Sequence, residues 1–153
     1  MSLAVDSIAA AEPSGREQLE ALMRRTDGQI AGIGRVLEFR LIEVDDGRVV
    51  FEGAPSRTFY NPIGSVHGGY AATLLDSACG CAVQSKLKGV QGYTTLELKI
   101  AYHRAMTEDT GPVRAEGRVV QIGRRAAFAE ATLKGLDGKL YASATSTLLV
   151  FER

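Results

Sequence analysis

The sequence has no excess of charge, only two cysteines and two histidines, and no tryptophan. Eighteen Lys and Arg balance eighteen Asp and Glu, so no net field attracts nucleic acid or an anionic membrane. The longest apolar stretch is shorter than about 20 residues and contains Asp76, which argues against a membrane span. The N-terminus lacks the basic segment and apolar core of a secretory signal. We therefore expect a cytoplasmic protein that binds neither nucleic acid nor membranes.

The two cysteines predict neither a disulfide nor a metal site. Cys79 and Cys81 stand two residues apart on an expected helix, so their side chains point away from each other. Nothing nearby supplies the remaining ligands of a metal site. We expect both to be small core residues in a reducing compartment, and we expect no metal and no redox cofactor.

The length of 153 residues suits one domain. We expect a flexible tail at residues 1–13 and a single domain at 14–153. Ser14 and Glu17 have the spacing of a helix capping box, and apolar residues at 19, 22 and 23 follow on one face. This pattern predicts a short amphipathic helix that ends near Asp27-Gly28.

The most informative stretch runs from His67 to Val83. From Gly68 onward it is small or apolar almost throughout, with Asp76 as its one ionisable group. A helix that is apolar on every side is buried, yet aspartate is rarely buried unless it is paired. We expect this helix to end in the basic turn Lys86-Leu87-Lys88 before Gly89.

Strand patterns precede and follow this helix. They lie at residues 37–41, 49–51, 96–102, 113–122, 127–133 and 141–150, and turn signals such as Asp45-Asp46-Gly47 and Asp137-Gly138 separate several of them. The order is a short helix, two strands, one long buried helix and a run of antiparallel strands. It predicts an α+β hotdog fold, in which a sheet of about five to six strands wraps around one long central helix.

The start of the central helix has the outline of an oxyanion hole. The N–H groups of Gly68 and Gly69 would lie at the positive end of the helix dipole, where they polarise a carbonyl oxygen. Glycine also lets a substrate approach the backbone closely. A tight start to the helix would need the same glycines, so the pair alone leaves both interpretations open.

The spacing between Gly68 and Asp76 has a consequence for assembly. Eight residues separate them, about 12 Å along one helix, so one substrate carbonyl cannot contact both. If both are catalytic, the second must come from another copy of the chain with its helix antiparallel to the first. The alternative is a buried Asp76 that backbone donors satisfy. The catalytic interpretation predicts an obligate dimer with composite sites.

A longer motif contains these residues. The segment Asn61-x5-His67-Gly68-Gly69-x6-Asp76-Ser77-Ala78 resembles the signature of the PaaI-like branch of hotdog-fold acyl-CoA thioesterases. The resemblance extends over residues 34–151, including the stretches Gly117-Arg118-Val119-Val120-x2-Gly123-Arg124 and Asp137-Gly138-Lys139-Leu140-x-Ala142.

The resemblance implies a role for each catalytic position. The Gly68 N–H would hold the thioester carbonyl, and Asp76 of the partner subunit would act as nucleophile or as general base for water. Thr94 stands where the family has a Ser or Thr that orients the water or the carboxylate. Asn61 and His67 would position the water and the thioester or leaving sulfur. Asn61 before Pro62 is also a common turn pair, and only the family spacing selects Thr94 over Thr95.

Substrate contacts are predicted at Gly69, Tyr70, Arg124 and Arg125. The two arginines suit bidentate contact with the phosphates of coenzyme A, although a solvated hairpin turn explains each of them slightly better. Tyr70 would line an aryl-acyl pocket or fill the core. Arg104, after an apolar strand, is either a structural ion-pair partner or a ligand contact.

The sequence thus predicts an acyl-CoA thioesterase that yields a free acid and CoA. The predicted assembly is a homo-oligomer, at least a dimer and by expectation a dimer of dimers. Two alternatives share the fold: a hydratase or dehydratase of acyl thioesters, and an acyl-CoA-binding module without catalysis. The acyl group stays open between aryl and straight-chain forms.

Overall fold

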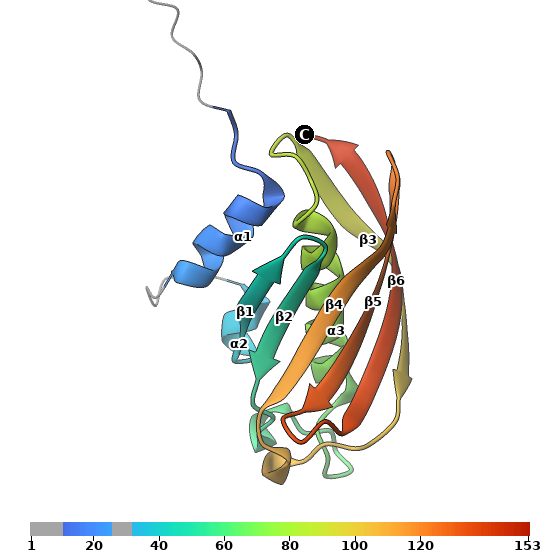
Figure 1. Ribbon diagram of the computed structural model, residues 1–153. Helices are drawn as coiled ribbons and strands as arrows, with labels where there is room; N and C mark the ends of the chain where they lie inside the picture. The colour runs from blue at the N-terminus through green and yellow to red at the C-terminus, as the bar shows by residue number, and fades with distance from the viewer. Residues whose placement is uncertain (1–10, 26–31) are drawn as a thin grey trace, which may run out of the picture.

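The computed structural model describes residues 11–25 and 32–153. Six strands form one antiparallel sheet in the order β1-β2-β4-β5-β6-β3, and this sheet curves around the long helix α3 (Figure 1). The predicted hotdog fold is therefore confirmed. The helices are α1 (Gly15–Arg24), α2 (Ile33–Val36) and α3 (Gly68–Gln84), with two 3-10 turns at Arg57–Phe59 and Glu108–Thr110. The strands are β1 (Phe39–Asp45), β2 (Arg48–Gly53), β3 (Gln91–Tyr102), β4 (Val113–Ile122), β5 (Ala126–Gly135) and β6 (Leu140–Glu152).

Most strand boundaries lie within two residues of the predicted ranges; the exceptions are the end of β1, at Asp45 instead of Leu41, and the start of β3. β4 coincides with the predicted range 113–122. β3 begins at Gln91, five residues before the predicted start at Leu96. A β-bulge between Thr95 and Glu97 shifts its register against β6, and a bulge breaks the alternation that a sequence pattern relies on.

The ends of the helices differ from the predictions. α3 stops at Gln84, ahead of the predicted basic turn, where the Ser85 hydroxyl donates to the Ala82 carbonyl and accepts from the Gly47 N–H. Gly89 does not end the helix; it allows the chain at Pro13 to pack closely, because a Cβ at residue 89 would lie 2.6 Å from the Pro13 carbonyl oxygen. α1 ends at Arg24; the predicted end near residues 27–28 lies outside the described residues. Of the predicted tail, only residues 11–13 are described, without regular secondary structure, and α2 was not predicted.

The core lies between α3 and the concave face of the sheet. Leu74, Leu75, Ala78 and Val83 of α3 are fully buried there. A Cβ on Gly117 would overlap the Ala78 carbonyl, so β4 approaches the helix backbone closely at this glycine. The predicted buried helix is thus confirmed. No helix in residues 11–25 and 32–153 is long and apolar enough to cross a membrane.

One side of α3 is less covered than the rest. Its half-buried residues recur at helical spacing, and Asp76 stands in the middle of them; the set is Gly68, Ala72, Thr73, Asp76, Ser77, Cys81 and Gln84. The burial pattern of β3 is similarly incomplete, because Leu98 and Ile100 on its inner face are only half-buried. Both elements therefore leave surface that the described part of the chain does not cover.

β3 is twelve residues long and forms one edge of the sheet. Its outer edge has no paired strand among the described residues. At the opposite edge, β1 is shorter, carries a bulge and packs against α1. A long unpaired edge is a template for pairing with another strand, so β3 is the better suited of the two edges for assembly.

Candidate active site

The start of α3 is organised by His67. Its backbone N–H donates to the Phe59 carbonyl at 2.7 Å, and its Nδ1 accepts from the Gly69 N–H at 2.8 Å. A neutral imidazole whose Nδ1 accepts carries its proton on Nε2, and the His67 side chain is exposed. His67 therefore caps the helix with one nitrogen and offers an N–H donor with the other.

Gly68 is the first residue of α3, and its N–H has no hydrogen-bond partner within residues 11–25 and 32–153. The Tyr102 hydroxyl donates to the Gly68 carbonyl at 3.0 Å. A Cβ on Gly68 would lie 3.0 Å from the Tyr102 ring, so a glycine suits this position. The free N–H at the positive end of a 17-residue helix is the donor that an oxyanion requires.

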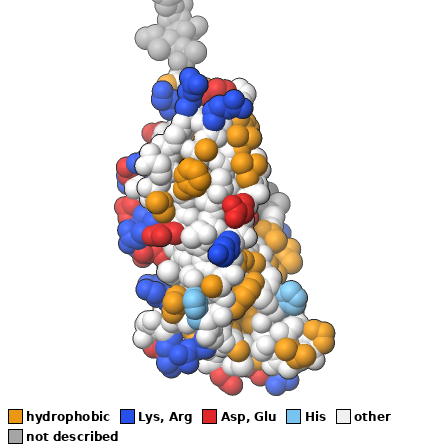
Figure 2. All heavy atoms as spheres, turned by 90° about the vertical axis from the view of Figure 1, so that its right-hand side faces the viewer, with side chains coloured by type: hydrophobic (Ala, Val, Ile, Leu, Met, Phe, Trp, Pro, Cys, Tyr) orange, Lys and Arg blue, Asp and Glu red, His pale blue; other side chains and the backbone are white. Residues whose placement is uncertain are grey.

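A cavity of about 480 Å³ lies beside Gly68, between the start of α3, the C-terminal end of β3 and the N-terminal end of β6. The wall includes His67, Tyr102, His103, Arg104 and Met106. Figure 2 shows both histidines of the chain on the same face of the molecule, with apolar side chains between them. A partly apolar hollow with a few convergent polar groups is typical of a small-molecule site.

Asp76 is held by a threonine of β3. The Thr95 hydroxyl donates to Oδ1 of Asp76 at 3.0 Å. Thr95 pairs with buried Leu148 on the face toward α3, whereas Thr94 is exposed and pairs with Leu149 on the outer face. The hydroxyl that reaches Asp76 within the chain is therefore that of Thr95, and a role for Thr94 stays a prediction.

Gly68 and Asp76 do not meet within one chain. Both lie on α3, eight residues apart, which is about 12 Å along the helix axis. The bond to Thr95 also shows that a side-chain donor partners the Asp76 carboxylate.

Asn61 shapes the loop that leads into α3. Its Oδ1 accepts from the N–H groups of Ile63 and Ser65, both at 3.1 Å, and its Nδ2 donates to the Ser65 hydroxyl at 3.1 Å. This is an Asx-type turn. The structure therefore supplies the turn that the Asn-Pro pair suggested, while a catalytic role for Asn61 stays a prediction.

Tyr70 lies in the core, away from the cavity beside Gly68. Its ring stacks on Phe59 with centroids 5.0 Å apart, and only 2% of the residue is exposed. Burial raises the pKa of its hydroxyl to about 12. The hydroxyl has no hydrogen-bond partner among the described residues. A substrate contact for Tyr70 stays a prediction that this packing does not support. Gly69 is exposed beside the cavity.

Arg124 and Arg125 lie at the other end of the sheet, in the turn between β4 and β5. The Arg125 carbonyl accepts from Val150, which pairs with Tyr93 on β3. Tyr93 precedes Tyr102 by nine residues, about 30 Å along a strand. Within one chain these arginines are therefore remote from Gly68.

Neither cysteine is suited to nucleophilic chemistry. Burial raises the pKa of the Cys79 thiol to about 12 and that of the Cys81 thiol to about 11. Thiols react as thiolates, so both stay unreactive near neutral pH. Within the described ranges, no three His, Cys, Asp or Glu side chains converge in a way that would hold a metal ion.

Two contacts of the site were beyond the sequence pattern. The Tyr102–Gly68 and Thr95–Asp76 hydrogen bonds both depend on which β3 residues face the helix. The alternation of residues 96–102 places Tyr102 on the inner face. The bulge between Thr95 and Glu97 shifts this alternation, so the pattern of residues 96–102 does not show that Thr95 also faces the helix.

Comparison with known proteins agrees with this architecture. The sequence model of the thioesterase superfamily matches residues 63–142, just over half of the chain, including Gly68 and Asp76. A conserved protein from Pseudomonas aeruginosa is 30% identical, with a TM-score of 0.74 over 80% of this chain and 95% of that chain. A phenylacetic acid degradation-related protein from Ralstonia eutropha JMP134 is 26% identical, with a TM-score of 0.74 over 86% of this chain and 98% of that chain.

The PaaI protein from the phenylacetic acid degradation operon of E. coli has the same fold. Its TM-score is 0.75 over 90% of this chain and 94% of that chain, at 19% identity. The superfamily match carries the general reaction, hydrolysis of an acyl thioester. The chain belongs to the thioesterase superfamily, and its hotdog fold is similar to that of the PaaI protein and the R. eutropha relative.

Proposed function

We propose that the protein hydrolyses acyl-CoA thioesters at sites shared between two subunits. One observation carries this proposal: the unpartnered Gly68 N–H and the Thr95-held Asp76 carboxylate lie on one helix, too far apart to serve one carbonyl. Both groups are what thioester hydrolysis needs, an oxyanion donor and a base or nucleophile. A second copy of the chain supplies the missing half of each site.

The β3 edge is the surface through which we expect the two copies to join. Tyr102 contacts Gly68 and Thr95 contacts Asp76, so the two halves of a site approach when Thr95 lies near Tyr102 of the partner subunit. An antiparallel pair of β3 strands with its two-fold axis at Leu98 brings them together, because Leu98, on the inner face, then lies opposite its own copy. Neighbouring strands lie about 4.8 Å apart, which brings Gly68 of one subunit close to Asp76 of the other.

Charge complementarity favours the same register. Glu97 and Lys99 lie on the outer face of β3, on either side of Leu98. An antiparallel pair centred there sets each Glu97 beside Lys99 of the partner subunit, and opposite charges across strands stabilise a pair. Lys99 is exposed and has no ion-pair partner within the described parts of the chain.

In the proposed reaction the thioester carbonyl oxygen accepts from the Gly68 N–H. Asp76 of the other subunit removes a proton from water, and the water oxygen attacks the carbonyl carbon. Collapse of the tetrahedral intermediate breaks the C–S bond and releases the acid and the CoA thiolate, which takes up the proton held by Asp76 and so restores the carboxylate. Thr95 holds Oδ1 of Asp76 and leaves Oδ2 for the water, while the Nε2–H of His67 is placed to donate to the thioester. No metal or redox cofactor takes part.

The direct test is turnover of an acyl-CoA panel, followed by release of the CoA thiol. Phenylacetyl-CoA comes first, because the R. eutropha relative is described as phenylacetic acid degradation-related; hydroxybenzoyl-CoA and hexanoyl-CoA follow. General-base catalysis contributes about 100- to 10,000-fold, so Asp76→Asn should lower kcat within that range. Wild-type turnover by Asp76→Asn would contradict the mechanism.

The base and the nucleophile assignments of Asp76 are separated by a single-turnover reaction in ¹⁸O-labelled water. Direct hydrolysis places the label in the released acid. A covalent anhydride that water opens at the Asp76 carbonyl carbon places the label in the Asp76 carboxylate, and that result would overturn the general-base assignment while leaving Asp76 catalytic.

A further inference from the structure

The cavity beside Gly68 carries a positive charge that no described residue neutralises. Arg104 lines this cavity together with His67 and His103, and no Asp or Glu belongs to its wall. Arg104 is exposed and makes no ion pair with any residue of the described ranges. Asp137, the acid of the neighbouring turn between β5 and β6, is already bound to Lys139 at 2.9 Å. The cavity therefore favours an anion.

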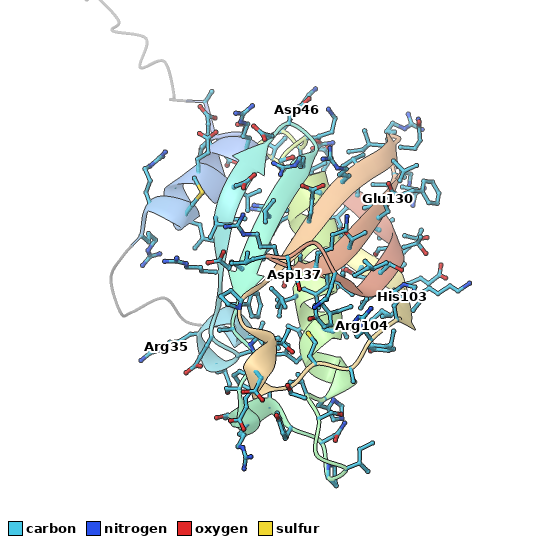
Figure 3. All side chains as sticks on the ribbon, turned by 60° about the horizontal axis from the view of Figure 1, so that its bottom comes forward. Arg35, Asp46, His103, Arg104, Glu130 and Asp137 are labelled. Carbon is cyan, nitrogen blue, oxygen red and sulfur yellow. The ribbon has the colours of Figure 1, made fainter. Side chains whose placement is uncertain are left out.

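Hydrogen bonds to β6 hold the backbone of His103 and Arg104, whereas the Arg104 side chain extends into solvent. The N–H groups of His103 and Arg104 both donate to the Tyr141 carbonyl, at 2.8 Å and 3.2 Å. The His103 ring contacts the Ser143 hydroxyl at 2.8 Å. Figure 3 shows His103 and Arg104 side by side at the end of the fold where α3 begins. The backbone that carries Arg104 is thus held in place, while its guanidinium donors have no partner among the described residues.

We propose that Arg104 binds a phosphate of the coenzyme A portion of the substrate. The proposal rests on the proposed function for one premise, that the thioester carbonyl lies at Gly68. Gly68 and the exposed Arg104 both line the cavity, and Met106, Tyr141 and Ala142 give its wall an apolar part. The pantetheine arm then lies along the cavity, and the phosphates reach Arg104.

The chemistry of arginine suits this role. A guanidinium forms two parallel charge-assisted hydrogen bonds with a phosphate, which a lysine cannot do. Arg104 also belongs to the same subunit as the Gly68 donor of its site, so one rigid unit positions both ends of the arm. Arg124 and Arg125 of that subunit lie about 30 Å away along β3 and would have to act from the partner subunit.

The test measures binding of free CoA, which needs no turnover. Calorimetry gives its Kd for the wild type, Arg104→Gln and two comparison variants. Arg35→Gln removes an exposed arginine of α2, remote from the cavity, and Arg125→Gln tests the competing assignment. Pantetheine, which has the same arm and no phosphate, is titrated in parallel by NMR. We expect Arg104→Gln to weaken CoA binding about tenfold, the effect of losing one charge-assisted contact, and to leave pantetheine binding unchanged.

Three results would overturn the proposal: unchanged CoA affinity in Arg104→Gln, an equal loss for CoA and pantetheine, or a loss confined to Arg125→Gln. If the first result comes with reduced turnover of succinyl-CoA relative to butanoyl-CoA, Arg104 binds an anion on the acyl group instead of a phosphate. If the wild type binds CoA through Arg104 and hydrolyses no acyl-CoA, the proposed function fails and the phosphate contact stands.

Discussion

The oxyanion role of Gly68 can be tested by removing one hydrogen atom with little change to the helix. Gly68 is the first residue of α3, where proline is favoured because the N–H it lacks has no partner within the helix. His67 has φ −60° and ψ 135°, the extended conformation that a residue before proline adopts. Gly68→Pro should therefore fold with α3 intact and lack the proposed oxyanion donor, while its added ring carbons call for a control.

The expected loss follows from measured oxyanion holes. Removing one such donor costs about 100- to 1,000-fold in kcat, or about 2.7–4 kcal/mol of transition-state stabilisation. Turnover of the best acyl-CoA substrate is measured by thiol release, and Tm by circular dichroism reports folding.

Gly68→Ala is the matched control. It keeps the N–H and introduces the same crowding against the Tyr102 ring, which a Cβ would approach to 3.0 Å. The Tyr102 residue is 57% exposed, so its side chain has room to shift. We expect Gly68→Ala to retain most of its kcat. Wild-type kcat in Gly68→Pro, or an equal loss in both variants, would refute the oxyanion assignment.

Three further predictions concern the groups around the site. Thr95→Val should lower kcat about tenfold, because the Asp76 carboxylate loses a positioning hydrogen bond. Thr94→Val, on the outer face, should leave kcat unchanged. A larger loss of kcat in Thr94→Val than in Thr95→Val would favour the family-based assignment of Thr94. Tyr70→Phe should raise the free energy of unfolding by about 1 kcal/mol at neutral pH, because it removes a buried hydroxyl without a partner in the described chain. Burial raises the pKa of the Tyr70 hydroxyl to about 12. The contribution of this group to stability is fully present below the pKa of the unfolded state and is lost as the pH rises from there towards 12. The Tm of the wild type should therefore fall more steeply with pH in this range than the Tm of Tyr70→Phe, and parallel curves would contradict the burial argument. Cys79 and Cys81 should resist iodoacetamide in the native protein at pH 8, since their pKa values are raised to about 12 and about 11; rapid alkylation followed by mass spectrometry would show otherwise.

The architecture was accessible from the sequence where its residues obey a simple period. The inner face of β5 alternates strictly, with buried alanines at 127, 129 and 131 and exposed Phe128 and Glu130 between them. The helix at 68–84 stands out because it is apolar on all sides. The first half of β3 was missed because a bulge and an open edge remove both the alternation and the burial that a pattern needs.

The site was only partly accessible for a related reason. Gly68 and Asp76 are conspicuous in a sequence because they are chemically odd in an apolar helix. Their partners Tyr102 and Thr95 are ordinary strand residues, and their roles arise from three-dimensional contact alone. Arg104 was noticed without a decision between an ion pair and a ligand contact, and only the absence of an acidic partner in the described chain distinguishes the two.

The central claim is that each active site takes Gly68 from one subunit and Asp76 from the other. A hybrid dimer tests it most directly: one subunit carries Gly68→Pro, the other carries Asp76→Asn, and two different affinity tags isolate the mixed species. In a composite arrangement both lesions fall in one site, and the second site is intact. The hybrid should then show about half the wild-type kcat per dimer, although each parent dimer is nearly inactive. A hybrid as inactive as its parents would mean that each subunit works with its own Gly68 and Asp76, and the shared site would be wrong.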